Sequence, residues 1–234
     1  MSKNKTNAIL PIQILFEDEH FIAINKPCGI PSQPDLTGDI SLLDYADNEL
    51  NKNFYVVHRI DRPVSGVIFF AKNDVAADYF AQILTQPETQ KTYWAIVNNS
   101  PPKKEDTLNH FIEHDTKKNK ARVYPEATPN AKPSELHYKL LADSDNYFLL
   151  EVTLQTGRFH QIRAQLAHIG CPIKGDVKYG ARRAEKDKSI GLHAEAYKFK
   201  SFMGEIINVT APPPDQPIWN HFAEAVKKLR WFNS

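Results

Sequence analysis

The chain has 234 residues, 41% of them hydrophobic, which is enough to bury a core as one domain or as two closely packed lobes. The sequence shows no apolar run that could span a bilayer, no apolar segment typical of a secretory signal and no CxxC pair, so a membrane span, secretion and a structural zinc site are not expected. The net charge is +1, but residues 1–50 hold three lysines against eight acids, whereas residues 157–183 hold six basic residues against one acid. The second stretch is either a face for a polyanion or an ordinary solvated surface.

In the first hundred residues, apolar segments rich in β-branched and aromatic residues alternate with two helical patterns. The predicted strands are a hairpin over 12–25, the buried strands 54–57 and 66–72, and the strand 91–98. A short helix is predicted over 41–51 with Ser41 as its N-cap. Asn73 or Asp74 starts a second helix, and its apolar face consists of Ala76, Phe80, Ile83 and Leu84.

The second half of the chain again favours hairpins. The polar, lysine-rich region 99–135 predicts short strands and loops rather than a stable helix. The other predicted elements are a hairpin of 135–142 with 146–156, a helix after Gly157 with the stripe Ile162, Leu166 and Ile169, a strand pair near 192–200 and 205–210, and a C-terminal helix with Ile218, Phe222, Val226 and Leu229 inward and Lys227, Lys228 and Arg230 outward. Many hairpins with few helices predict an α+β fold with a mainly antiparallel sheet.

The segment HFIEH, residues 110–114, matches a zinc-peptidase spacing, H-x-x-E-H. That motif requires a helix that brings His110 and His114 to one face, and a third ligand further along the chain. The flanking residues show no sustained helical period, so we interpret the match as chance. A zinc hydrolase remains the rival that a metal assay would test.

Two further segments carry chemistry only when they are taken together. In HRIDRPVSGVIFFAK, residues 58–72, Asp61 lies on a turn before a buried strand, and a turn aspartate alone has no functional meaning. In residues 154–170 a strand ends at a Thr-Gly turn and a helix with basic first turns begins, which favours an anion. The loop 172–180 that follows predicts a phosphate-contacting surface. Taken alone, Tyr93 is an ordinary sheet tyrosine.

These segments resemble the motifs of the RluA-type pseudouridine synthases. Residues 58–72 resemble that family's H-R-[LI]-D-x-x-[TS]-G motif. The other similar segments are NKPCGI (25–30), KTYWAIV (91–97), LQTGRFHQIRAQLAHIGCPIKGDVKYG (154–180) and GLHA (191–194). The resemblance covers about residues 12 to 215 in the family's order. It departs at Pro63 and Val64, and region 99–135 has no matching signature.

The resemblance implies a pseudouridine synthase fold, in which a long, mainly antiparallel mixed sheet is flanked by helices and loops around a central active-site cleft. We expect residues 1–11 to be a tail and 12–234 to be one catalytic domain without a separate N-terminal RNA-binding domain. The implied reaction isomerises specific uridines of ribosomal or transfer RNA to pseudouridine and needs no cofactor or metal. The expected protein is a cytoplasmic monomer whose partner is RNA, and two distant cysteines fit a reducing compartment.

The resemblance also assigns roles to individual residues. Asp61 becomes the catalytic carboxylate, as nucleophile or as base. Arg163 is the expected partner that keeps Asp61 ionised, Tyr93 is expected to lie against the base and to help remove its C5 proton, and Arg59 is expected to fill the gap left by the flipped base. The other residues expected to bind substrate are His58, Arg62, Arg158, His160, Gln161, Lys174 and Leu192. An alternative is a non-catalytic RNA-binding protein on the same fold, which would not need Asp61.

Overall fold

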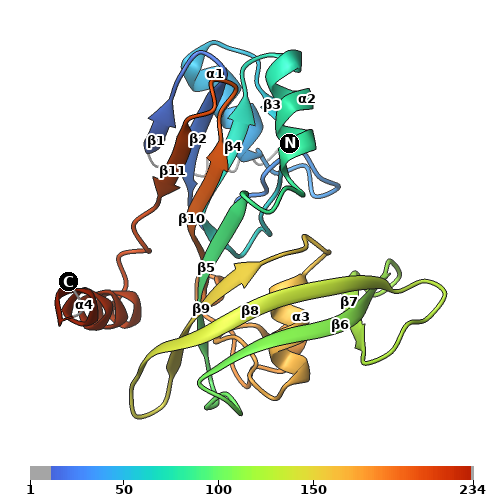
Figure 1. The fold of residues 1–234 in the computed structure, drawn as a ribbon, viewed down its shortest axis with the longest axis vertical. Coiled ribbons are helices and arrows are strands. Elements are labelled where there is room, and N and C mark those ends of the chain that lie inside the picture. Colours follow the sequence, from blue (N-terminus) through green and yellow to red (C-terminus); the bar gives the residue numbers. More distant parts are fainter. Residues whose placement is uncertain (1–11, 233–234) are drawn as a thin grey trace, which may run out of the picture.

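The computed structural model describes residues 12–232, with side chains up to residue 227, and these residues build one mixed sheet with four α-helices (Figure 1). The strands are β1 (Ile14–Glu17), β2 (Phe21–Lys26), β3 (Tyr55–Val56), β4 (Ser65–Ala71), β5 (Gln90–Val97), β6 (Glu105–Asp115), β7 (Lys120–Tyr124), β8 (Lys132–Asp143), β9 (Phe148–Leu154), β10 (Leu192–Lys200) and β11 (Ile206–Thr210). The helices are α1 (Leu42–Leu50), α2 (Asp74–Ile83), α3 (Gln161–His168) and α4 (Pro217–Phe232), with a 3₁₀ turn at Val177–Tyr179. No helix within 12–232 is both long and apolar enough to cross a membrane.

The sheet has the order β1-β2-β4-β10-β5-β9-β8-β6-β7, and β3 and β11 pair with β4 and β10. The pair β4–β10 is parallel, and the other pairings of the named strands are antiparallel. The predicted α+β class with a mainly antiparallel sheet is therefore confirmed.

Helices cover both faces of the sheet in each half of the molecule (Figure 1). In the half containing β4, alternate residues point to opposite faces, so Phe69 packs in one cluster with Phe80 of α2, whereas Ile68 packs with Leu42 of α1. In the other half, α3 and α4 occupy opposite faces in the same way. The sheet is thus buried on both faces along much of its length.

The two early helices begin where the sequence predicts. The hydroxyl of Ser41 accepts a hydrogen bond from the backbone N–H of Asp44, whose carboxylate in turn accepts from the backbone N–H of Ser41, which is a capping box. Asn73 caps α2 by accepting from the backbone N–H of Ala76. Both caps are local features, which explains why sequence reasoning found them.

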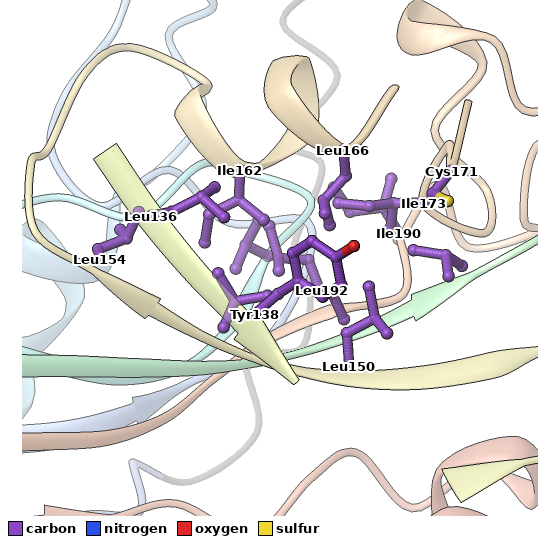
Figure 2. Close-up of a cluster of buried hydrophobic side chains, with 14 of the residues drawn as sticks. Leu136, Tyr138, Leu150, Leu154, Ile162, Leu166, Cys171, Ile173, Ile190 and Leu192 are labelled. Atoms are coloured by element: carbon purple, nitrogen blue, oxygen red, sulfur yellow. The ribbon is translucent and has the colours of Figure 1, made fainter. Parts of the chain in front are cut away.

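The core beneath α3 is the cluster that positions the candidate site (Figure 2). Ile162 and Leu166 of α3 point toward the strands and pack with Tyr138 of β8 and Leu150 of β9. Burying one such aliphatic side chain stabilises the fold by about 1.5–3 kcal/mol. The same cluster includes Ile60 and Val64, the buried residues on either side of the 61–63 turn.

The two halves of the sheet meet where β4 runs parallel to β10. Gly66 has φ 115°, and a Cβ there would lie 2.2 Å from the carbonyl oxygen of Ala194, so the strands approach more closely than a side chain allows. Beside it, buried His193 contacts the Ser65 hydroxyl through Nδ1 at 2.9 Å and the Ala211 carbonyl through Nε2 at 3.1 Å. Because the Ala211 carbonyl can only accept, Nε2 carries the proton and the Ser65 hydroxyl donates to Nδ1.

Three strand and helix predictions need correction or extension. Segment 54–57 is not a buried strand, because β3 has only two residues and Tyr55 is 45% exposed. Region 99–135 does not form only short strands, because β6 has 11 residues and is paired on both sides, by β7 and by β8. In α4 the sequence missed Trp219, which is buried with Phe222. The predicted tail 1–11 and the predicted orientations of Lys228, Leu229 and Arg230 lie outside the described part.

Candidate active site

Asp61 lies on the turn that leads into β4, at the junction of the two halves. The turn closes with a hydrogen bond from the backbone N–H of Val64 to the Asp61 carbonyl at 3.0 Å. Ile60 and Val64 are buried, whereas the Asp61 side chain remains 29% exposed. The turn therefore presents a solvent-accessible carboxylate from a rigid support.

The loop 26–32 holds the backbone of this turn. Lys26 is completely buried, and its ammonium group donates to the carbonyls of Pro27 at 2.9 Å, Ile30 at 2.8 Å and Arg62 at 3.2 Å. The backbone N–H of Gly29 donates to the same Arg62 carbonyl at 2.8 Å. Burial lowers the pKa of Lys26 to about 7, and the negative charge of Asp61 is among the influences that oppose this shift.

Ser32 adds a second link between the same loop and the turn. Its buried hydroxyl donates to the Ile60 carbonyl at 2.8 Å and accepts from the Ile60 backbone N–H at 3.3 Å. Both backbone groups of the residue before Asp61 are satisfied by this one side chain. The conformation of the turn thus depends on a loop about thirty residues earlier in the chain.

The carboxylate of Asp61 is held from the other half, by Arg163 of α3. Arg163 donates from one terminal nitrogen to Asp61 Oδ2 at 2.9 Å, so the predicted contact is present. Its Nε and its other terminal nitrogen bind the two oxygens of Asp176 at 2.7 and 2.9 Å. The side chains of Arg163 and Asp176 are 6% and 1% exposed. Asp176 therefore fixes the guanidinium in the plane that aims its remaining nitrogen at Asp61.

The charge of this arginine is secured by its two carboxylates. Burial lowers the pKa of Arg163, but hydrogen bonds and charge attraction from Asp176 and Asp61 outweigh it, so the net pKa lies above the usual value. The three side chains form an acid–base–acid row in which the outer aspartate, Asp61, is the more exposed. The fixed cation of Arg163 lies 2.9 Å from Asp61 Oδ2 and orients that oxygen.

His160 lies on the other side of the same carboxylate oxygen. Its Nε2 is 3.6 Å from Asp61 Oδ2, and its Nδ1 is 2.9 Å from the hydroxyl of Tyr179. That hydroxyl accepts from the backbone N–H of Ala121 at 2.7 Å, which leaves its own proton for Nδ1. His160 then carries its proton on Nε2, facing Asp61. Burial lowers the pKa of His160 to about 4, so the imidazole is neutral at pH 7.

Tyr93 comes from β5 and packs against the core cluster that contains Ile60 and Val64. Burial raises the pKa of Tyr93 above its usual value, and the negative charge of Asp61 adds to the shift. Its phenol therefore stays protonated at neutral pH. A tyrosine whose hydroxyl keeps its proton near Asp61 is better suited to contact a nucleobase with its ring than to accept a proton from that nucleobase.

Four residues expected to bind substrate are instead engaged within the fold. His58 Nε2 accepts from the Phe69 backbone N–H at 2.9 Å and its ring stacks on Phe80; burial lowers its pKa to about 3. Gln161 is buried and bridges the Thr156 hydroxyl and the Arg158 backbone N–H. Leu192 is buried in the cluster of Figure 2, and the ammonium group of Lys174 pairs with Glu185.

The side chain of Lys174 points away from the core beneath α3. Ile173 faces the core beneath α3, so the next residue points to the other side, where the ammonium of Lys174 lies 5.6 Å from the ring centre of Tyr147. Arg62 is also engaged, because it binds Asp39 at 2.6 Å and Asp35 at 3.1 Å on the 35–39 loop. A substrate role for these residues stays a prediction that the geometry does not favour.

The arginines at the rim have different surroundings. Arg59 is exposed, two residues before Asp61, and is not bonded to any residue of the described part. Arg158 is half-buried, and its Nε donates to the Pro133 carbonyl at 2.9 Å. Arg59 is therefore free to contact a ligand, whereas Arg158 has part of its guanidinium committed to β8.

Several residues that shape the site were not assigned to it from the sequence. The loop 172–180 was expected to contact phosphate, but its Asp176 and Tyr179 are buried and hold Arg163 and His160. A single acid within a basic stretch was the available signal for Asp176. Lys26 was recognised only as part of the NKPCGI motif and Ser32 gave no signal, because both act on backbone groups of a turn about thirty residues later.

The HFIEH segment lies on β6 and not on a helix. Two residues four apart on a strand are about 13 Å apart along it, too far to share one zinc ion. His110 instead accepts from the Gln165 side-chain amide at 3.0 Å through Nδ1. His110 and His114 therefore cannot bind one zinc ion together, so the HFIEH match gives no support to the zinc hydrolase alternative.

A surface cavity of about 320 Å³ lies beside β6 and β8, lined by residues that include His110, Pro133 and Thr156. It does not include Asp61 in its lining. The central cleft expected at Asp61 stays a prediction.

Comparisons with known proteins show the family to which the chain belongs. A family model described as RNA pseudouridylate synthase matches residues 20–168. The uncharacterized RNA pseudouridine synthase YhcT of Bacillus subtilis is 31% identical over 230 residues, which are 92% of this chain and 74% of that protein. The ribosomal large subunit pseudouridine synthase C of Rickettsia felis is 34% identical over 207 residues, 86% of this chain and 67% of that protein.

The fold is also shared with solved structures. Human RNA pseudouridylate synthase domain containing 1 has a TM-score of 0.75 at 20% identity, with 92% of this chain and 94% of that chain covered. Because the family model spans more than half of the sequence and the relatives match most of it, the chain belongs to the RluA-type RNA pseudouridine synthases, isomerases that convert uridine in RNA to pseudouridine.

Proposed function

We propose that this protein isomerises specific uridines in ribosomal or transfer RNA, with Asp61 as the catalytic group acting on a flipped-out base. The observation that carries the proposal is the row Asp61–Arg163–Asp176, in which a buried, doubly held guanidinium binds an exposed carboxylate at 2.9 Å. An ordinary turn aspartate needs no such support. A carboxylate that must remain ionised beside a flat, neutral base does need it.

The chemistry requires that the bond between uracil N1 and ribose C1′ breaks and that a bond from uracil C5 to C1′ forms. A carboxylate such as Asp61 can attack the sugar or remove a proton from it. The N–H of neutral His160 faces the same oxygen at 3.6 Å and limits how that oxygen can turn. The C5 proton must leave afterwards while N1 gains a proton, and water can carry the proton from one to the other, so no atoms are gained or lost. Tyr93, whose phenol keeps its proton at neutral pH, would contribute its ring as a contact for the uracil.

A uridine in folded RNA reaches such a group only after flipping, which costs a few kcal/mol. Arg59 is exposed two residues before Asp61, which supports the proposal that its side chain occupies the vacated position in the stack. Tyr93 would contact the flipped base, and the basic stretch 157–183 would bind the phosphates. These contacts offset the cost of flipping.

The ribosomal relatives support ribosomal RNA as the first substrate class to test, with transfer RNA second. We propose that residues 12–234 act as one catalytic domain, as a monomer in the cytoplasm and without a cofactor or metal. The two free cysteines, Cys28 and Cys171, are consistent with a reducing compartment.

The test is a pseudouridine map of total RNA from cells with and without this protein, together with purified protein on transcripts of ribosomal and transfer RNA. We expect at least one uridine to be modified only when the protein is present, and the same position to be modified by the pure protein. Salt-dependent RNA binding without pseudouridine in either experiment would leave a non-catalytic RNA-binding protein as the correct interpretation.

A further inference from the structure

Two basic segments that are far apart in the sequence meet beside the site. Residues 116–124, at the tip of the β6–β7 hairpin, contain Lys117, Lys118, Lys120 and Arg122 and no acid. Residues 177–184 contain Lys178, Arg182 and Arg183 and no acid. Six of these seven side chains are exposed, and Lys120 is partly buried.

Direct contacts join the two segments. The ammonium of Lys178 donates to the Asn119 carbonyl at 3.0 Å, and the Ala121 backbone N–H donates to the Tyr179 hydroxyl at 2.7 Å. The ammonium of Lys120 lies 5.0 Å from the centre of the Tyr179 ring. The hairpin tip is therefore docked against residues 177–184, and we call the surface that these two adjoining segments form the hairpin surface.

The hairpin surface is continuous with the candidate active site. Tyr179, at its centre, binds His160, and His160 lies 3.6 Å from Asp61. On the β6 side, the ring of exposed His114 stacks on Phe159 at 3.8 Å, and Phe159 stacks on His160 at the same distance. A ladder of rings thus runs from the hairpin to the residue beside the carboxylate.

We infer that the hairpin surface extends the phosphate contact proposed for residues 157–183 onto the β6–β7 hairpin, where it holds the phosphates of the strand next to the flipped uridine. The inference rests on the proposed function, because it extends the substrate contact of the same site. Exposed cations beside the exposed ring of His114 fit single-stranded RNA, whose phosphates need the charge and whose bases need a stacking partner. An acidic protein segment would use the cations but not the ring of His114.

The charge is available for a partner. Arg122 pairs with Asp115 at 2.5 Å, but Lys117, Lys118, Arg182 and Arg183 are not paired with any acid of the described part. Four unneutralised cations within two adjoining segments attract a polyanion and repel one another when none is bound. Region 99–135, for which the sequence gave no role, thereby receives one.

The experiment compares the double variants Lys117→Ala/Lys118→Ala and Arg182→Ala/Arg183→Ala with wild type. The matched control is Lys103→Ala/Lys104→Ala, an exposed lysine pair at the opposite end of the hairpin, about 35 Å away along β6. The RNA is a transcript of large-subunit ribosomal RNA or unfractionated transfer RNA, whichever wild type modifies. The readouts are KM and saturated rate for pseudouridine formation, and the salt dependence of filter binding.

Each test variant is expected to raise KM at least tenfold, to keep the saturated rate within about twofold, and to reduce the slope of log affinity against log salt by about 1.4 for two lost phosphate contacts. His114→Ala is expected to weaken binding without changing that slope, because it removes the ring that stacks on Phe159 and leaves every lysine and arginine in place. If wild type is active and both double variants match the control, the inference is wrong and the proposed function stands. If wild type binds RNA through these cations but makes no pseudouridine, the proposed function is wrong and the RNA surface stands.

Discussion

The two halves of the molecule hold the Asp61 turn in different ways. The loop 26–32 of the N-terminal half forms hydrogen bonds with the backbone of the turn, through Lys26, Gly29 and Ser32. It does not contact the Asp61 carboxylate. The C-terminal half contacts the Asp61 carboxylate itself, through Arg163 and His160. The N-terminal half therefore sets the position of the carboxylate, and the C-terminal half sets its direction and supplies the charged partner.

This difference has a physical basis. Backbone hydrogen bonds fix a turn without altering the chemistry of its side chain, so the loop 26–32 can support a reactive residue without neutralising it. A charged partner changes both the direction and the protonation of a carboxylate, so Arg163 must itself be held in place, as it is by Asp176. Substitutions in the two halves should therefore fail in distinguishable ways.

The largest effect is expected from Asp61→Asn, which keeps the size of the side chain and removes the charge that the C-terminal half binds. Pseudouridine formation should fall at least about 100-fold, because a neutral amide is neither nucleophile nor base. RNA affinity should stay within about tenfold, or 1.4 kcal/mol, because Arg59 and the basic segments are unchanged. The measurement counts pseudouridine in labelled RNA beside a filter-binding curve.

The matched control for this variant is Asp78→Asn, an exposed carboxylate on α2 outside the site. It should behave as wild type in both assays. Normal turnover by the Asp61 variant would show that the carboxylate has no part in the mechanism. The contacts that hold the turn and the carboxylate would then be purely structural.

Arg163→Leu should combine loss of activity with loss of stability. It removes the partner of Asp61 and leaves Asp176 as a buried, unpaired charge, which costs about 3–5 kcal/mol. Chemical denaturation and turnover report the two effects separately.

The double variant Arg163→Leu/Asp176→Asn separates charge from folding, because the amide no longer needs a cation. It should recover part of the stability and none of the activity. Recovery of turnover together with stability would mean that the row only supports the fold.

Lys26→Met removes hydrogen bonds between the loop 26–32 and the turn, so it should change only the position of Asp61. It leaves the carbonyls of Pro27 and Ile30 without a donor, at about 1–3 kcal/mol for each one that water does not reach, whereas the Arg62 carbonyl keeps the Gly29 backbone N–H. We expect a lower melting temperature and a reduced single-turnover rate at saturating RNA, with RNA affinity unchanged. A variant that is destabilised but reacts at the wild-type rate would show that the turn keeps its place without this lysine.

The sequence predicted what depends on local pattern or on a recognisable motif. Ser41 and Asn73 cap helices through neighbours three residues away, and residues 150–154 alternate because one face of β9 is buried. Asp61 and Arg163 were paired through the resemblance. The length of β6 was missed because it depends on partners along both edges, and Asp176 and Lys26 were missed because their importance lies in contacts across the fold.

The smallest effect is a pH dependence of stability at the seam between the halves, where β4 pairs with β10. Burial lowers the pKa of His193 to about 4, against about 6.5 in the unfolded chain. Between these values the unfolded state binds a proton that the folded state does not, so stability is fully present above pH 6.5 and is lost as pH falls toward 4, by at most about 1.4 kcal/mol per pH unit. His193→Gln removes the titrating group, so its unfolding free energy, measured in urea from pH 7 to 4, should fall less steeply than that of wild type. His58 and His160 shift in the same direction and titrate in both proteins, so the difference between the two curves isolates the seam. Parallel curves would show that His193 does not contribute to the acid sensitivity of the fold.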